Sequence, residues 1–204
     1  MRTDITIDPR LTIEDIKDVI NLPEVIRLTD FEDKDLAEFE KDMNDAHNTG
    51  QPVIPIVVDS YGGNIYNLLG VISAIENASL PVATICTSKA MSAGAIVFCF
   101  GSEGYRFMDP NAVLMFHDAA SFSCGKVEDI KADTNHIDQM NQSMYKRVAK
   151  HLGHKDTYFL EIIKNDHNHV DWYMGSKEAK KHKIANQLRV PKFEVKLSLD
   201  IKFG

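Results

Sequence analysis

Short apolar runs alternate with amphipathic segments along most of the chain. Residues 53–58 and 82–86 are β-rich apolar runs, typical of strands that are covered on both faces. Residues 65–75 lie between them and place apolar side chains on one face of a helix. A strand, a glycine turn, a helix and a second strand make a β-α-β unit, whose crossover is expected to be right-handed. The pattern therefore predicts an α/β domain built on a parallel-type sheet.

The flanking segments continue this pattern. Strands are predicted at residues 25–28, 105–108 and 112–116, helices at residues 33–47, 157–164 and 176–180, and a half-exposed edge strand at residues 193–201. A long helix is predicted at residues 127–150, because Ile130, Ile137 and Met144 recur at heptad spacing. Its other faces are polar, so we expect it to project from the body of the protein.

The first candidate for chemistry is Ser92, which follows the strand at residues 82–86 and a short polar turn predicted at residues 87–89. It lies where a helix of small residues begins. Free backbone N–H groups and the positive end of the helix dipole favour developing negative charge at such a place. A serine there is a nucleophile if a base reaches it, although a serine at a helix start more often serves only as a cap.

The second candidate is His117, at the end of the strand predicted for residues 112–116. If that strand lies beside residues 82–86, Ser92 and His117 reach the same end of the sheet, where parallel sheets hold their ligands. The glycine pair at residues 62–63 closes another strand at that end and can turn N–H groups into a cleft. A serine nucleophile, a histidine base and two backbone N–H donors would form an acyl-transfer site.

Two aspartates, Asp166 and Asp171, are candidates to orient the imidazole of His117. A plainer interpretation also fits these residues. A histidine at a strand end is more often a hydrogen-bonded surface group, and an aspartate in a polar loop is usually solvated. The residue pattern alone leaves both interpretations open.

Four segments carry motifs that can be compared with a known family. They are VVDSYGG at residues 57–63, AMSAGA at residues 90–95, RFMDPNAVLMFH at residues 106–117 and DWYMGSKEA at residues 171–179. In this order they resemble the Ser-Pro-Gly-Gly turn, the nucleophile motif Ala-Ala-Ser-Met-Gly-Ala, the stretch leading to the histidine, and the aspartate segment of ClpP, the proteolytic subunit family of the Clp protease. Gly63 and Ser92 are 29 residues apart, and Ser92 and His117 are 25 apart, which fits the family spacing.

The resemblance implies a serine endopeptidase with named roles. Ser92 would attack the peptide carbonyl, and His117 would take its proton and return it to the leaving amine. Asp171 would fix the histidine tautomer, since the register of the motif selects it over the other loop aspartate. The backbone N–H groups of Gly63 and Ala93 would hold the oxyanion. No metal or other cofactor is implied.

The resemblance covers about residues 25–188 and also implies a fold and an assembly. The ClpP/crotonase-like fold consists of repeated β-β-α units that form a mostly parallel sheet with a projecting handle helix, here residues 127–150. The domain is then expected at residues 25–190, after an N-terminal arm at residues 1–24 and before a tail at residues 191–204. Two stacked heptameric rings of identical subunits would enclose the sites, a tetradecamer. Unfolded proteins or peptides would be the substrates, and ATP would act only through a Clp-type AAA+ unfoldase.

The chain also departs from the family pattern. Tyr61 replaces a proline, Asp118 and Ala119 replace Gln-Pro after the histidine, Ala93 stands where methionine is usual, and the arm and tail are unlike those of the family. These departures keep two alternatives open: an inactive scaffold subunit of a mixed ring, and a protease of limited processing, as in phage head maturation. A crotonase-type acyl-CoA enzyme is the third, and the serine–histidine spacing argues against it.

Composition and charge narrow the class of protein further. A net charge of −7 and an isoelectric point near 5.6 argue against a general nucleic-acid binder. No apolar run approaches the length of a membrane span, and the N-terminus lacks the apolar core of a signal peptide. Three cysteines favour a reducing compartment without a disulfide framework, so we expect a cytoplasmic protein, or one of the host cytoplasm if the gene is carried by a phage.

Two further patterns have plain interpretations. His167 and His169 resemble a metal-binding pair, but a solvated polar loop is the better interpretation, and no metal site is predicted. Lys89 precedes Ser92 by three residues and suggests a serine–lysine dyad. Its place in a predicted turn favours a surface lysine, and His117 already supplies a base.

Overall fold

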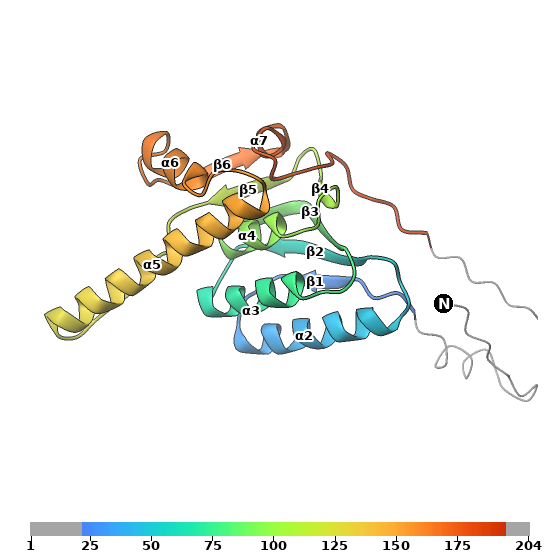
Figure 1. Ribbon diagram of the computed structural model, residues 1–204, viewed down its shortest axis with the longest axis horizontal. Coiled ribbons are helices and arrows are strands. Elements are labelled where there is room, and N and C mark those ends of the chain that lie inside the picture. Colours follow the sequence, from blue (N-terminus) through green and yellow to red (C-terminus); the bar gives the residue numbers. More distant parts are fainter. Residues whose placement is uncertain (1–21, 195–204) are drawn as a thin grey trace, which may run out of the picture.

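The computed structural model describes residues 22–194 (Figure 1). Nearly all of the expected N-terminal arm, residues 1–24, and most of the edge strand predicted at residues 193–201 lie outside the described residues. No helix within the described range is long and apolar enough to cross a membrane.

A six-stranded sheet forms the centre of the described part of the chain. Its strands are β1 (Ile26–Leu28), β2 (Ile54–Ser60), β3 (Val82–Met91), β4 (Arg106–Met108), β5 (Val113–Phe116) and β6 (Trp172–Gly175). The order is β1-β2-β3-β5-β6, and β4 pairs with β3 beside this path. All pairings are parallel except that of β5 with β6. The prediction of a mostly parallel α/β sheet is therefore confirmed.

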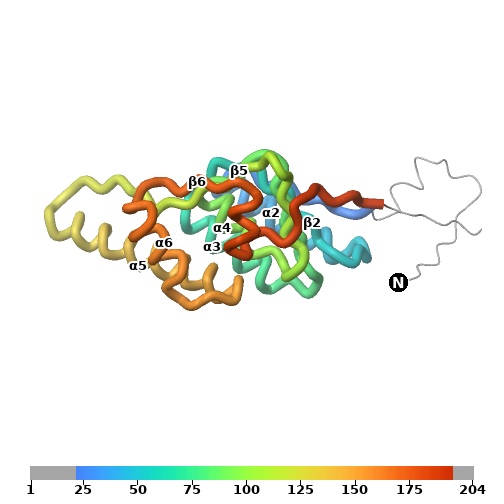
Figure 2. The backbone as a smooth tube through the Cα atoms, turned by 90° about the horizontal axis from the view of Figure 1, so that it is seen from above, coloured from blue at the N-terminus to red at the C-terminus, as the bar shows by residue number. Residues whose placement is uncertain are grey.

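The helices follow the apolar periodicity of the sequence closely. They are α2 (Asp33–Asn48), α3 (Ile65–Glu76), α4 (Ala93–Cys99), α5 (Val127–His151), α6 (Tyr158–Asn165) and α7 (Ser176–Lys181). Figures 1 and 2 both show α5 extending beyond the sheet, as predicted. Its buried residues, Met144, Tyr145, Val148 and Ala149, all belong to its last third. The helix is thus anchored at its C-terminal end, close to the sheet.

Strand β3 differs from the prediction of a strand followed by a polar turn at residues 87–89. It continues through these residues to Met91, and α4 begins at Ala93. The reason is that β3 has two successive partners on one side. Residues 84–86 pair with β4, and residues 89–91 pair with β5. The second pairing supplies the backbone hydrogen bonds that local sequence does not reveal.

Strand β6 was not predicted, because only four residues separate the polar loop from α7. Its residues alternate between buried and exposed, and Trp172 and Met174 enter the core. This alternation is the pattern of a half-buried strand. The antiparallel pairing of β6 with β5 places the segment after the polar loop beside the end of β5.

Candidate active site

Ser92 occupies a sharp turn between β3 and α4. Its backbone has φ 53° and ψ −122°, a conformation that costs a non-glycine residue about 1–3 kcal/mol. The Ser92 N–H donates a hydrogen bond to the carbonyl of Met115, 2.8 Å away, and this bond fixes the turn to β5. The hydroxyl makes no capping hydrogen bond to α4. Ser92 is the N-cap residue of α4, but its side chain does not cap the helix. Its hydroxyl is therefore available for other partners.

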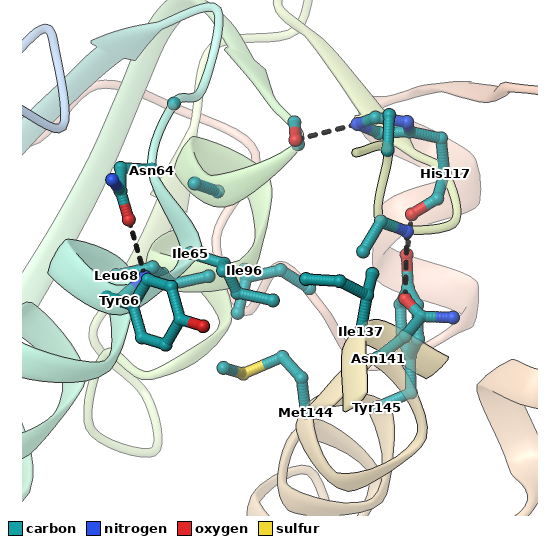
Figure 3. Close-up of a pocket in the computed structure, with 15 residues that line it drawn as sticks. Asn64, Ile65, Tyr66, Leu68, Ile96, His117, Ile137, Asn141, Met144 and Tyr145 are labelled. Atoms are coloured by element: carbon teal, nitrogen blue, oxygen red, sulfur yellow. Dashed lines mark hydrogen bonds between the residues drawn. The ribbon is translucent and has the colours of Figure 1, made fainter. Parts of the chain in front are cut away.

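The hydroxyl of Ser92 meets the imidazole of His117. Ser92 Oγ lies 2.7 Å from His117 Nε2 (Figure 3). The two residues come together because β3 and β5 are parallel neighbours, with Met91 opposite Met115, and each residue follows close on the end of its strand. A neutral imidazole that accepts the serine proton through Nε2 is the arrangement of a nucleophile and its general base.

The glycine turn after β2 packs directly against the nucleophile. Gly62 and Gly63 have φ values of 104° and 154°, and a Cβ atom at Gly62 would lie 2.6 Å from Ser92 Cβ. Gly62 also donates its N–H to Ser60 Oγ at 2.9 Å. Gly63 and Ala93 line the same cleft as Ser92, and Ala93 is the first residue of α4, where an N–H has no intrahelical acceptor. Their role as oxyanion donors stays a prediction.

Helix α5 holds the segment that carries His117. The hydroxyl of Tyr145 donates to the carbonyl of His117 at 2.7 Å. The side chain of Asn141 accepts the N–H of Ala119 at 3.1 Å and donates to Asp118 Oδ1 at 2.8 Å. Burial raises the pKa of the Tyr145 hydroxyl, so it remains a donor across the neutral range. Sequence reasoning missed Asn141 and Tyr145, because no local signal connects a helix to a loop more than twenty residues earlier.

Asp171 lies beside His117 without bonding to it. The register pairs Phe116 with Trp172, so His117 and Asp171 occupy the next opposed positions, just beyond the paired strands. The described hydrogen bond of the Asp171 carboxylate is the one from the Tyr173 hydroxyl, at 3.5 Å. The side chain is exposed. The role of Asp171 as the orienting acid stays a prediction.

The alternative acid, Asp166, is the C-cap residue directly after α6 and donates its backbone N–H to the carbonyl of Ile162. Among the described hydrogen bonds and ion pairs, none joins it to His117. Asp118, which follows the histidine directly, is paired instead with His169, whose Nδ1 lies 2.5 Å from Asp118 Oδ2.

The two loop histidines have separate surroundings. His169 pairs with Asp118, whereas the ring of His167 stacks on Trp172 with 5.0 Å between centroids. Within residues 22–194 no group of three or more histidine, cysteine or acidic side chains is arranged to hold a metal ion. His169 and His167 thus contact different partners, a carboxylate and an indole ring.

Lys89 is engaged away from the nucleophile. Its Nζ lies 2.6 Å from Asp59 Oδ1 and 4.5 Å from the centroid of the Tyr61 ring. The hydrogen bond from Lys89 lowers the pKa of the Asp59 carboxyl, which keeps the ion pair intact in neutral solution. These partners favour a structural ion pair over a serine–lysine dyad.

A cleft of about 400 Å³ opens from Ser92 and His117 and runs between α3 and α5 (Figure 3). Its apolar walls are formed by Ile65, Leu68, Ile96, Ile137 and Met144. A mostly apolar cleft with a few convergent polar groups at one end is the usual form of a small-ligand or side-chain site. The geometry places a space for an apolar group next to the serine hydroxyl.

Comparison with known proteins gives a family match and several relatives. The profile of the family described as Clp protease matches residues 33–190. Three relatives carry the name ATP-dependent Clp protease proteolytic subunit. The one from Bacteroides fragilis is 28% identical over 139 residues, which cover 68% of this chain and 65% of the relative. The one from Bacteroides thetaiotaomicron is 30% identical over 139 residues, which cover 68% of this chain and 61% of the relative. Subunit 1 from Salinibacter ruber is 27% identical over 144 residues, 71% of this chain and 59% of its own. The matched region spans less than two thirds of the length of each of these relatives.

Proposed function

The chain belongs to the Clp protease family, and on that premise we propose that it is a serine peptidase with Ser92 as the nucleophile and His117 as the general base. The observation that carries the proposal is the 2.7 Å contact between Ser92 Oγ and His117 Nε2 at a strained strand-to-helix turn. Such a turn exposes a serine hydroxyl at the end of a sheet, beside backbone donors.

The proposed reaction is acyl transfer to serine and then to water. Ser92 Oγ bonds to the carbonyl carbon while its proton passes to His117 Nε2. The oxyanion that forms is stabilised by the N–H groups of Gly63 and Ala93. Collapse of this intermediate breaks the C–N bond, and His117 returns the proton to the leaving amine. Water then attacks the acyl-enzyme with the same base, releasing the acid and restoring the Ser92 hydroxyl.

Asp171 is included in the proposal as the group that orients the imidazole. It occupies the position opposed to His117 across the end of the β5–β6 pair. To reach His117 Nδ1, its carboxylate must turn from the Tyr173 hydroxyl, which it contacts at a long 3.5 Å. Catalytic hydrogen bonds are often long in unliganded enzymes and tighten when substrate binds.

We also place the assembly and the partners within this proposal. Helix α5 projects from the body and has no buried residue in its first two thirds, which supports contact with other copies of the chain. Stacked heptameric rings, unfolded proteins or peptides as substrates, a Clp-type unfoldase as the ATP-dependent partner, and a cytoplasmic location follow from the family. The subunit itself needs no cofactor in this proposal.

One observation favours a second candidate function, that of an inactive scaffold subunit in a mixed ring. Among the described hydrogen bonds, that of the Asp171 carboxylate is to Tyr173 and none joins it to His117, so the third member of the triad is not hydrogen-bonded to the base. A scaffold would keep the fold and the assembly surfaces while its active site no longer turned over substrate. Labelling of the serine separates the two functions.

Labelling with a fluorophosphonate tests the proposal directly. The wild-type protein is expected to be modified at Ser92, as located by mass spectrometry, and Ser92→Ala is expected to remain unlabelled. Wild-type protein that has not been treated with the label should also cleave fluorogenic peptides, and casein when an unfoldase is present. Labelling that persists in Ser92→Ala would contradict the assignment, and an intact protein that is neither labelled nor active would identify the scaffold.

A further inference from the structure

A side-chain contact joins the two helices that flank the apolar cleft, at the end away from the nucleophile. Tyr66, in the first turn of α3, lines the cleft, and its hydroxyl lies 3.1 Å from His136 Nε2 on α5. Their rings are stacked with 6.3 Å between centroids and an angle of 23°. Figure 3 shows Tyr66 and Met144 at the end of the cleft away from His117. The pair therefore bridges the cleft opposite the nucleophile.

The backbone beneath Tyr66 is held firmly. Asn64 caps α3, and its Oδ1 accepts the N–H of Tyr66 at 2.8 Å (Figure 3). Asn64 directly follows Gly63, so one cap connects the predicted oxyanion turn to the helix turn that carries Tyr66. Further along the same helices, Arg147 Nη2 lies 2.7 Å from Glu76 Oε2. Side-chain contacts thus join α3 and α5 at two levels.

The ring of Tyr66 is held less firmly than its backbone. The residue is 55% exposed, so packing alone does not fix its side chain. The contacts that place its ring across the cleft are those with His136, the hydroxyl–imidazole bond and the ring stack. His136 is itself exposed on α5. The position of the Tyr66 ring consequently depends on a partner from the opposite wall.

We propose that Tyr66 limits the size of the substrate side chain next to the cleaved bond, and that His136 is a positioning residue that holds the Tyr66 ring in place. This inference rests on the proposed peptidase function. When Ser92 attacks a carbonyl, the side chain on its acyl side lies nearest the serine hydroxyl and enters the adjacent apolar cleft. Tyr66 stands at the other end of that cleft, so a longer side chain meets its ring.

Peptidyl diphenyl phosphonates provide the test, because they react with an active-site serine without turnover. Two probes differ only in the residue next to phosphorus, leucine in one and tryptophan in the other. The rate of Ser92 modification is measured for each by mass spectrometry. Wild type is expected to favour the leucine probe, and Tyr66→Ala should raise the tryptophan-to-leucine rate ratio by about tenfold, within the range known for size selection in apolar pockets.

The positioning role of His136 is tested by the same ratio. His136→Ala should shift it in the direction of Tyr66→Ala, by a smaller factor. His136→Gln, whose amide oxygen can accept the tyrosine proton, should stay closer to wild type. Tyr66→Phe keeps the ring and loses the hydroxyl, so combining it with His136→Ala should add little to either change alone. Tyr105→Ala is the matched control, an exposed tyrosine outside the cleft, and should leave the ratio unchanged.

The outcomes distinguish a failure of the roles proposed for Tyr66 and His136 from a failure of the peptidase function. If wild type is labelled at Ser92 but Tyr66→Ala keeps the wild-type ratio, the size-limiting role is wrong while the peptidase function stands. If His136→Gln and His136→Ala shift the ratio equally, the positioning role of the hydrogen bond is wrong. If neither probe modifies wild-type Ser92, the peptidase proposal fails and this inference fails with it.

Discussion

At the scale of single residues, the site depends on a serine in a conformation that its neighbours impose. Ser92 has a positive φ, and two backbone hydrogen bonds hold it there: its N–H donates to the carbonyl of Met115, and its carbonyl accepts from Ile96. Gly62 lies against it on the other side. Strain of this kind persists only where the surroundings over-determine it. The position of the Ser92 hydroxyl therefore depends on how closely the glycine turn can approach the backbone of Ser92.

Replacing Gly62 with alanine tests this dependence. The new Cβ would lie 2.6 Å from Ser92 Cβ, a distance that forces one backbone to move. We expect Gly62→Ala to lower kcat/KM on a fluorogenic peptide by at least about a hundredfold, since a displacement near 1 Å can cost that much. Steady-state kinetics and chemical denaturation are the measurements.

Gly104→Ala is the matched control for this prediction. Gly104 also has a positive φ, 86°, but no atom lies within 4 Å of the position that an alanine methyl group would take there. Gly104→Ala should lose about 1–2 kcal/mol of unfolding free energy, because alanine is strained at positive φ. Gly62→Ala should lose more, because its methyl group also collides with Ser92. Only Gly62→Ala should lose activity. Equal activity in the two variants would show that the glycine turn does not position the nucleophile.

At the scale of elements, a helix or strand could be predicted where its own residues carry a clear apolar pattern. Helices α2, α3 and α5 carry their own apolar periodicity and were predicted within one or two residues. The length of β3 and the existence of β6 depend on pairing with β5, which lies elsewhere in the chain. Local propensity contains no information about such partners.

The candidate site shows the same difference between features that local sequence indicates and features that depend on distant segments. Ser92 and His117 were predicted because each follows a recognisable strand, and the two strands proved to be neighbours. The bond from Tyr145 to His117 and the bridge from Tyr66 to His136 join residues 28 and 70 positions apart. They depend on how α5 packs against the rest of the chain, so no spacing in the sequence could indicate them.

Helix α5 is predicted to act on catalysis through Tyr145. Tyr145→Phe removes the hydrogen bond to the His117 carbonyl and leaves the ring in the core. We expect kcat to fall by about tenfold, a fraction of the roughly 10²- to 10⁴-fold that a positioned general base contributes. Unfolding free energy should fall by about 1 kcal/mol, as for other single hydrogen bonds.

Thr84→Val is the control for this loss of a buried hydroxyl. Thr84 Oγ1 donates to the Phe98 carbonyl at 2.7 Å, within the core and away from the cleft. The Thr84→Val substitution should lower the free energy of unfolding by a similar amount and leave kcat near wild type. A fall in kcat that matches between Thr84→Val and Tyr145→Phe would mean that α5 affects activity only through overall stability.

At the scale of the whole molecule, the described chain leaves apolar surface uncovered around α5. Phe122, in the loop just before this helix, is 93% exposed, and Val127 at its start is also exposed. The first two thirds of α5 bury no residue within the chain. A soluble monomer usually shows large apolar residues singly, whereas gathered ones mark interfaces. This distribution fits the proposed contact between copies of the chain along α5.

Phe122→Asp tests the contact without disturbing the subunit. Because the side chain is 93% exposed, the substitution should leave the unfolding free energy of the subunit within about 0.5 kcal/mol of wild type. A charge buried unpaired in an interface is costly, so the assembly should dissociate into smaller species in sedimentation velocity, and peptidase activity should fall with it. Tyr105→Asp places the same charge on an exposed aromatic position far from α5 in the sequence and should keep the wild-type sedimentation. If Phe122→Asp also sediments as wild type, the loop before α5 is outside the interface, and the helix must meet its partner through its remaining faces.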